Sequence, residues 1–131
     1  GLVVSGAADA ADARALLVAW LKRLGRRELV PWLERLAREA GLTYARAAVR
    51  GQRSRWGSCS RRGTISLNYK LLFLEPALVE HVMLHELAHT RHLNHSHAFW
   101  RLLARLDPHG RAHHAALQHA GAQVPAWTEC D

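Results

Sequence analysis

Hydrophobic residues recur at three- and four-residue steps along residues 9–41, which predicts amphipathic helix. Gly25 lies inside this stretch and is expected to break or kink it into two helices, and Gly41 is the expected C-terminal cap. The tryptophans are expected in the hydrophobic core rather than in a binding site. The apolar positions are Leu17, Trp20, Leu21, Leu24, Leu29, Trp32, Leu33, Leu36 and Ala40.

Two strand-like stretches follow the helical region. Residues 43–50, "TYARAAVR", and residues 64–68, "TISLN", are rich in β-branched or alternating positions and predict β-strands. The segment between them, "GQRSRWGSCSRRG", is rich in glycine, serine and arginine, so we expect a loop or a wide hairpin turn there.

The remainder of the chain has helical signals again. Pro76 fits the first turn of a helix that runs to about residue 92. Ser96 can cap a second segment, and Asp107-Pro108 fits the N-cap and first turn of a last helix that ends near Gly121. The sequence therefore predicts one small α+β domain over residues 1–131, with N-terminal helices, a short β-sheet and C-terminal helices.

Composition narrows the class of protein. The chain has 131 residues, 49% of them hydrophobic, which fits one globular domain. No apolar run approaches the length of a membrane span, and the first residues do not resemble a signal peptide. Cys59 and Cys130 lie far apart and form neither a disulfide framework nor a zinc-finger pattern, so a location in the reducing cytoplasm is expected. The net charge of +7 favours polyanionic partners, although a solvated basic surface would also account for it.

One stretch carries the strongest chemical signal: "VMLHELAHTRHLNH", residues 82–95. His85 and His89 are four residues apart and share one helix face, so both imidazoles can reach one Zn²⁺ at about 2.0–2.1 Å. Glu86 lies about 100° further round the helix, where it can act as a general base on a metal-activated water. Imidazole also suits other divalent transition metals, and a metal-free hydrogen-bonded cluster is the alternative.

The third metal ligand must come from beyond the helix. A continuous helix would carry His92 about 11 Å from His85, too far for one tetrahedral metal. The chain must therefore turn back, and Asn94 tolerates the left-handed conformation that a turn requires. His95 is the preferred third ligand, with His92, His97 and glutamate residues as alternatives.

Other potential ligands are expected to play lesser parts. His81 precedes the motif by one helical turn, and we expect it at the surface or in a supporting role. His109 and His113 also have helical spacing but lack an adjacent glutamate, so an exposed helix face is expected rather than a second metal site. Cys59 is not needed as a ligand where three histidines are available.

Four motifs together resemble the YgjP-like metallopeptidase domain family, which is related to the SprT-like and WLM domain proteins. They are RxRWGSC at 53–59, ISLN at 65–68, HELAH at 85–89 and NHSxxFW at 94–100, and the resemblance covers roughly residues 20–120. It implies a zincin-like fold and bound Zn²⁺. Members usually carry a further N-terminal, strand-rich portion that is not found in this sequence. The resemblance implies metal ligands at His85, His89 and His95, with Glu86 as the base.

The arginine-rich loop and the second strand supply candidate substrate contacts. Arg55, Trp56 and Asn68 come from the family motifs and are the candidate substrate-binding residues. Arginine can grip phosphate or carboxylate and tryptophan can stack on a base, while the alternative places Trp56 in the core beneath the loop. Residues 64–68 are expected either to form the edge on which an extended peptide adds as a strand, or to be paired within the sheet.

Three functions are compatible with these signals. A zinc metallopeptidase acting on peptides is favoured by the HExxH motif and by the resemblance. A metal-dependent nucleotide pyrophosphatase or phosphohydrolase would use the basic loop. A DNA-associated protease or nucleic-acid-binding module would use the same loop to bind nucleic acid.

Overall fold

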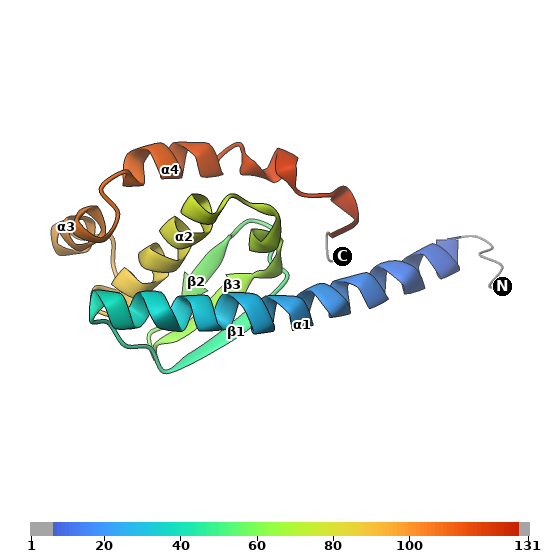
Figure 1. The fold of residues 1–131 in the computed structure, drawn as a ribbon, viewed down its shortest axis with the longest axis horizontal. Coiled ribbons are helices and arrows are strands. Elements are labelled where there is room, and N and C mark those ends of the chain that lie inside the picture. The colour runs from blue at the N-terminus through green and yellow to red at the C-terminus, as the bar shows by residue number, and fades with distance from the viewer. Residues whose placement is uncertain (1–6, 129–131) are drawn as a thin grey trace.

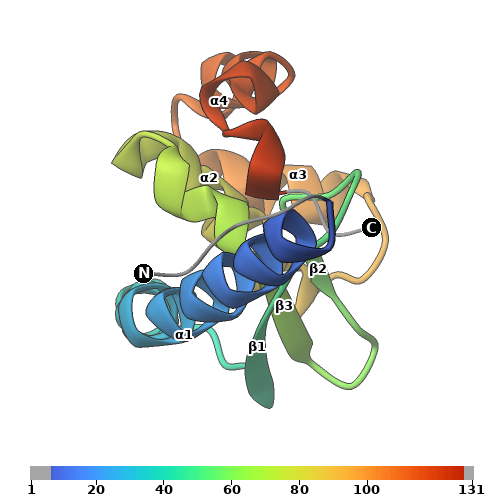
Figure 2. The ribbon, with the colours of Figure 1, turned by 90° about the vertical axis from the view of Figure 1, so that its right-hand side faces the viewer.

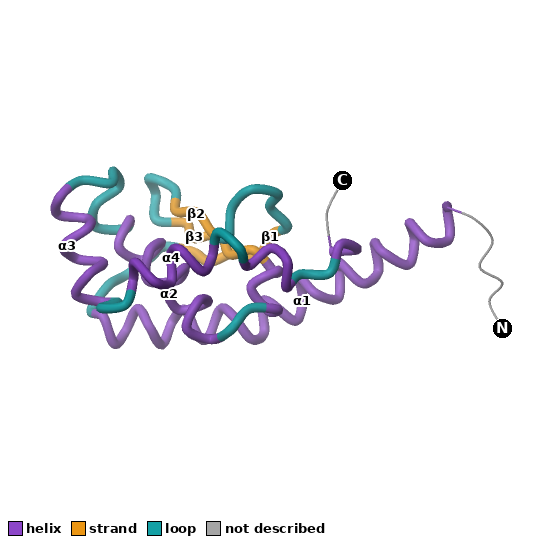
Figure 3. Tube along the Cα trace, turned by 90° about the horizontal axis from the view of Figure 1, so that it is seen from above, coloured by secondary structure: helices purple, strands orange, loops and turns teal. Residues whose placement is uncertain are grey.

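The computed structural model describes residues 7–128 and has an α+β architecture, as predicted (Figure 1). Four α-helices accompany one three-stranded sheet in this part of the chain. The helices gather mainly on one side of the sheet (Figure 3). In chain order the elements are α1 (Ala7–Ala40), β1 (Arg46–Arg50), β2 (Gly57–Cys59), β3 (Thr64–Asn68), α2 (Pro76–His89), α3 (His97–Leu106) and α4 (Gly110–Leu117).

Helix α1 is a single helix, so the predicted break at Gly25 is wrong. A Cβ atom at Gly25 would lie 2.9 Å from Cγ1 of Val49 on β1. The glycine therefore allows the helix to approach the sheet closely rather than interrupting it. The predicted cap at Gly41 is confirmed, because its φ of +69° reverses the chain and Leu42 N–H donates to the carbonyl of Ala37 at 2.9 Å.

The N-terminal half of α1 runs past the body of the molecule (Figure 1). Trp20 on this half is 50% exposed, so its expected place in the core is wrong. Trp32, further along, is partly buried and donates through Nε1 to Glu80 Oε2 at 2.7 Å. No helix within residues 7–128 has the length and apolar character that a membrane crossing requires.

The sheet has the order β1-β3-β2. Strand β1 pairs in parallel with β3, with Arg46 opposite Thr64, while β2 pairs antiparallel with β3, with Ser58 opposite Ser66. The segment expected to be a loop or wide hairpin turn therefore contains a strand of its own. The tight turn lies at residues 60–63, where Gly63 has φ of +87°.

This strand order corrects the expectation for residues 64–68. Strand β3 is paired on both sides, so it is the centre of the sheet rather than an edge for an added peptide. Strand β2 is the edge strand beside α2, and a Cβ atom at Gly57 would lie 3.1 Å from Cγ of Glu86.

Helix α2 is the central helix, packed against α1, β2, α3 and α4 (Figure 2). It ends at His89, before the predicted end near residue 92. The predicted cap at Ser96 is confirmed, because its side chain accepts from the backbone N–H of Phe99. The predicted start of the last helix at Asp107-Pro108 is wrong: α4 begins at Gly110 after His109, and it ends at Leu117.

Candidate metal centre

Three imidazoles converge beside α2. Helix α2 carries His85 and His89 on one face, and the segment before α3 brings His95 against them. The Nε2 atoms of His89 and His95 are 3.1 Å apart, and those of His95 and His85 are 3.4 Å apart. Ligands at tetrahedral angles around a metal with bonds of about 2.0–2.1 Å would be about 3.3 Å apart. The donor set and its spacing therefore fit one divalent metal ion.

The chain turns back immediately after α2 to place His95. The hydroxyl of Thr90 donates to the carbonyl of Leu87 at 2.6 Å, and His92 N–H donates to the carbonyl of Ala88 at 3.0 Å. These bonds add to the backbone hydrogen bonds that the same two helix-end carbonyls accept from the N–H groups of Thr90 and Arg91. No residue other than glycine has positive φ within residues 7–128, so the predicted left-handed turn at Asn94 is wrong.

A backbone hydrogen bond orients His89. Its Nδ1 lies 3.0 Å from the carbonyl oxygen of His92, which can only accept, so Nδ1 carries the proton. The lone pair is then on Nε2, the atom that faces His95. The side chains of His92 and His97 are not part of the three-histidine group, although the backbone of His92 supports it.

Burial keeps the imidazoles of His85 and His89 neutral. It lowers the pKa of His85 to about 4, and the nearby His89 and His95 lower it further. Burial also lowers the pKa of His89. At neutral pH these rings offer lone pairs rather than protons, the form in which imidazole binds metals.

Two aromatic residues of α3 pack on the histidine rings. Phe99 is fully buried and stacks on His89, with centroids 4.3 Å apart and planes 22° apart. Trp100 stacks on His95 at 5.4 Å and 23°. The sequence pattern placed both aromatics on a helix, but not their contacts with the imidazoles. The sequence signal that could have found them is their spacing of four and five residues from His95.

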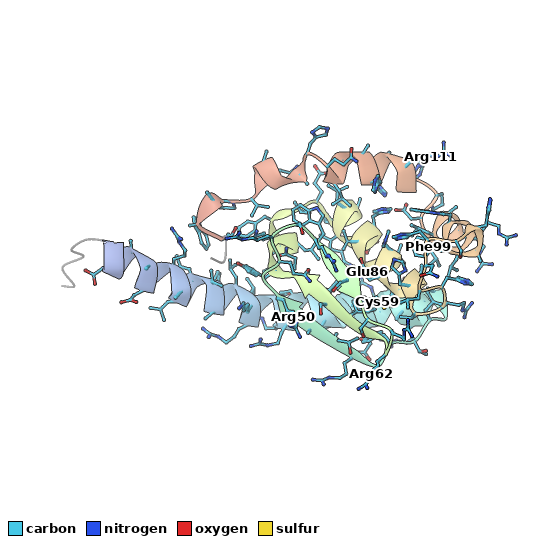
Figure 4. The ribbon with its side chains drawn as sticks, turned by 180° about the vertical axis from the view of Figure 1, so that it is seen from behind. Arg50, Cys59, Arg62, Glu86, Phe99 and Arg111 are labelled. Atoms are coloured by element: carbon cyan, nitrogen blue, oxygen red, sulfur yellow. The ribbon has the colours of Figure 1, made fainter. Side chains whose placement is uncertain are left out.

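Glu86 lies buried between α2 and β2 (Figure 4). Glu86 is 7% exposed. Burial raises the pKa of its carboxyl to about 7, while the charge of Arg55 acts to lower that pKa.

Cys59 on β2 lies near enough to Glu86 for the carboxylate charge to change the pKa of its thiol. Burial raises the pKa of the Cys59 thiol to about 11, and the Glu86 charge adds to the rise. Cys130 is outside the described residues.

The predicted substrate-contact residues line one cavity of about 450 Å³. Arg55, Trp56 and Asn68 share it with Lys70 and others. Trp56 is also partly buried and packs against the hydrophobic core, as the structural alternative predicted. Asn68 is 2% exposed and bonded to the backbone of the loop, so holding the loop is its visible role. Contact with substrate stays a prediction for all three.

A second group of potential ligands lies one helical turn before His85. His81 is 3% exposed, so of its two expected places the one at the surface is wrong, while a supporting role stays a prediction. It is hydrogen-bonded to Asp107, and His113 bonds the same carboxylate. The expected exposed face is therefore wrong for His113, which is half-buried. Sequence spacing could not reveal this group because Asp107 is far from His81 along the chain.

The family model for the YgjP-like metallopeptidase domain matches residues 1–120. The chain belongs to this family. A comparison with curated proteins gave no match. Among solved structures, the chain is similar to the metallopeptidase zymogen abylysin of Pyrococcus abyssi, with 26% sequence identity and a TM-score of 0.58. The likeness covers 69% of this chain and 90% of the abylysin chain. Family membership and this likeness support a metal-dependent peptidase.

Proposed function

We propose that the protein is a zinc-dependent metallopeptidase in which His85, His89 and His95 bind the metal and Glu86 is the general base. The observation that supports it most directly is the spacing of the three Nε2 atoms, at 3.1 and 3.4 Å along the pairs through His95. The neighbouring buried carboxylate supplies the proton acceptor that peptide hydrolysis needs.

The chemistry divides between the metal and the chain. A divalent zinc ion held by three imidazoles would supply Lewis-acid activation of water and of the substrate carbonyl. Glu86 takes the proton of the attacking water at its carboxylate and delivers it to the nitrogen of the leaving amine. Its pKa of about 7 suits both steps, because a base poised near the working pH both accepts and releases the proton.

Strand β2 is the proposed place for the peptide. It is the edge of the sheet, and it runs against α2 at Glu86. An extended peptide that adds to this edge would make backbone hydrogen bonds with β2 and pass beside the base. Such a mode gives affinity for peptides without requiring a particular side-chain sequence.

The decisive experiment compares Glu86→Gln with the wild type in zinc content and in cleavage of a casein panel. We expect the same zinc content in both and a loss of turnover of at least 100-fold in the variant, the order expected for a general base. Glu75→Gln is the matched control, because Glu75 is an exposed carboxylate at the start of the same helix. Full casein cleavage by a metal-loaded Glu86→Gln protein would refute the assignment.

The basic cavity supports a nucleotide substrate as the second candidate. Arg53, Arg55 and Lys70 line it, and an anionic phosphate group would suit such a lining. Release of pyrophosphate from a nucleoside triphosphate, measured on the same preparations, separates this activity from peptide cleavage.

The DNA-associated alternative is tested by DNA binding across a salt series, since phosphate contacts weaken steeply with salt. The cytoplasmic location stays a prediction.

A further inference from the structure

Three elements bring a second set of metal-ligating groups together. His81 lies on α2, Asp107 follows α3, and His113 lies on α4. Their donor atoms all lie within 4.8 Å of one another. None of the three belongs to the group formed by His85, His89 and His95.

The two imidazoles meet at one carboxylate oxygen. Nδ1 of His81 is 2.6 Å from Oδ2 of Asp107, and Nδ1 of His113 is 2.8 Å from the same atom. The other oxygen, Oδ1, accepts the backbone N–H of His109 at 3.1 Å. The carboxylate is thus held by the backbone while one oxygen faces both rings, as in many metal sites whose ligands are oriented by further hydrogen bonds.

The spacing also suits a particular coordination geometry. Ligands at right angles around a metal with bonds of about 2.1 Å lie about 3.0 Å apart. The two measured separations are a few tenths of an ångström shorter, so small side-chain shifts would admit an ion. A set of two histidines and one carboxylate on one face of an octahedron is typical of divalent transition metals.

A cavity beside the second group gives a metal ion access to its ligands. His81 and Asp107 line a cavity of about 770 Å³ between α2, α3 and α4. Water in that cavity could complete the coordination of an ion held by three protein ligands. His81 and Asp107 are themselves buried, with side chains 3% and 8% exposed, and the half-buried His113 closes the group from α4.

We propose that His81, Asp107 and His113 form a second binding site for a divalent transition metal, separate from the HExxH site. Binding replaces the two hydrogen bonds with metal–ligand bonds: the imidazoles bind through Nδ1 in the tautomer protonated at Nε2, and Asp107 binds as the carboxylate. The ion links α2, the end of α3 and α4. Because the ligands are assembled only in the folded chain, binding stabilises the fold.

Cobalt(II) titration of the chelator-treated protein tests the proposal. We expect the wild type to bind two equivalents of Co²⁺ and His113→Ala to bind one. In a His89→Ala/His95→Ala background, which removes most of the first site, we expect one equivalent. Adding His113→Ala to that background should abolish binding, and adding Asp107→Asn should weaken it at least tenfold. His119→Ala is the matched control because its side chain is exposed and outside both groups.

Thermal unfolding supplies an independent measurement. Co²⁺ should raise the Tm of the background protein and of its His119→Ala derivative, but not that of its His113→Ala derivative. Unfolding curves without metal establish that each variant is folded. A His89→Ala/His95→Ala background that binds no Co²⁺ would overturn the proposal, as would binding to that background that is unchanged by His113→Ala. Either result would identify the group as a hydrogen-bonded linkage alone.

Discussion

The side-chain amide of Asn68 donates a hydrogen bond to the backbone carbonyl of Arg55 at 2.8 Å. It also donates to the carbonyl of Gln52 at 2.9 Å, and its Oδ1 accepts from Lys70 N–H at 3.0 Å. One buried side chain on the central strand thus fixes the arginine-rich loop that leads into β2. Because β2 packs against Glu86, the position of that loop bears directly on the candidate metal centre.

Replacing Asn68 with aspartate should lower the free energy of unfolding by about 1–3 kcal/mol, because a carboxylate cannot donate to the two loop carbonyls. Chemical denaturation measures the loss. Asn94→Asp is the matched control, since Asn94 is exposed, and its effect should be within about 0.5 kcal/mol. Equal stability of the two variants would contradict the role given to Asn68.

Replacing His95 with alanine should lower the zinc content by about one equivalent per chain, because only two imidazole ligands would be left at the first site. Elemental analysis of the purified protein measures zinc per chain. His92→Ala is the matched control: it removes an imidazole from the same segment but keeps the backbone carbonyl that orients His89. Retention of a full equivalent at this site by the His95 variant would transfer the third-ligand role to another residue.

Alanine at Gly25 should destabilise the protein even though it improves helix propensity. The new Cβ would lie 2.9 Å from Cγ1 of the buried Val49, and overpacking of this kind costs about 1–3 kcal/mol. The propensity gain is at most about 1 kcal/mol. Gly121→Ala provides the comparison, because nothing lies within 4 Å of its added Cβ. Denaturation midpoints should fall for Gly25→Ala alone.

The thiol of Cys59 should react slowly with alkylating reagents at neutral pH. Burial raises its pKa to about 11, with a further contribution from Glu86, so about a thousandth of it is thiolate at pH 8. In the chelator-treated Cys130→Ser protein, the rate of iodoacetamide reaction should rise steadily from pH 7 to 9.5. Cys59→Ser gives the background. A plateau below pH 9 would mean that the thiol is not held in its neutral form.

Local signals in the sequence predicted the features that depend on residues close together along the chain. The helical spacing of His85 and His89, the Ser96 cap and the reversal at Gly41 all involve contacts within one or two turns. Strand β2 was missed because the residues Gly57, Ser58 and Cys59 have neither β-branching nor alternation. Its pairing with β3 and packing on α2 favour the extended form where local propensity does not.

Contacts between segments far apart along the chain could not be predicted from the sequence pattern. The meeting of His81 with Asp107 depends on how α3 returns across α2, which no periodicity encodes. Trp20 belongs to a regular apolar pattern, yet it is 50% exposed while Val18 and Leu21 on either side of it are buried. The pattern therefore marks the apolar residues of this part of α1 without telling which of them face the sheet.

Parallel pairing of β1 with β3 makes the sheet slow to nucleate. The two strands cannot be joined by a tight turn, so residues 51–63 must be ordered before their pairing is complete. The β2–β3 hairpin, by contrast, closes through a short local turn. We expect refolding to form this hairpin first, so Gly57 and its neighbours are in place before β1 docks, and the chain's folding rate is governed by that late, non-local step.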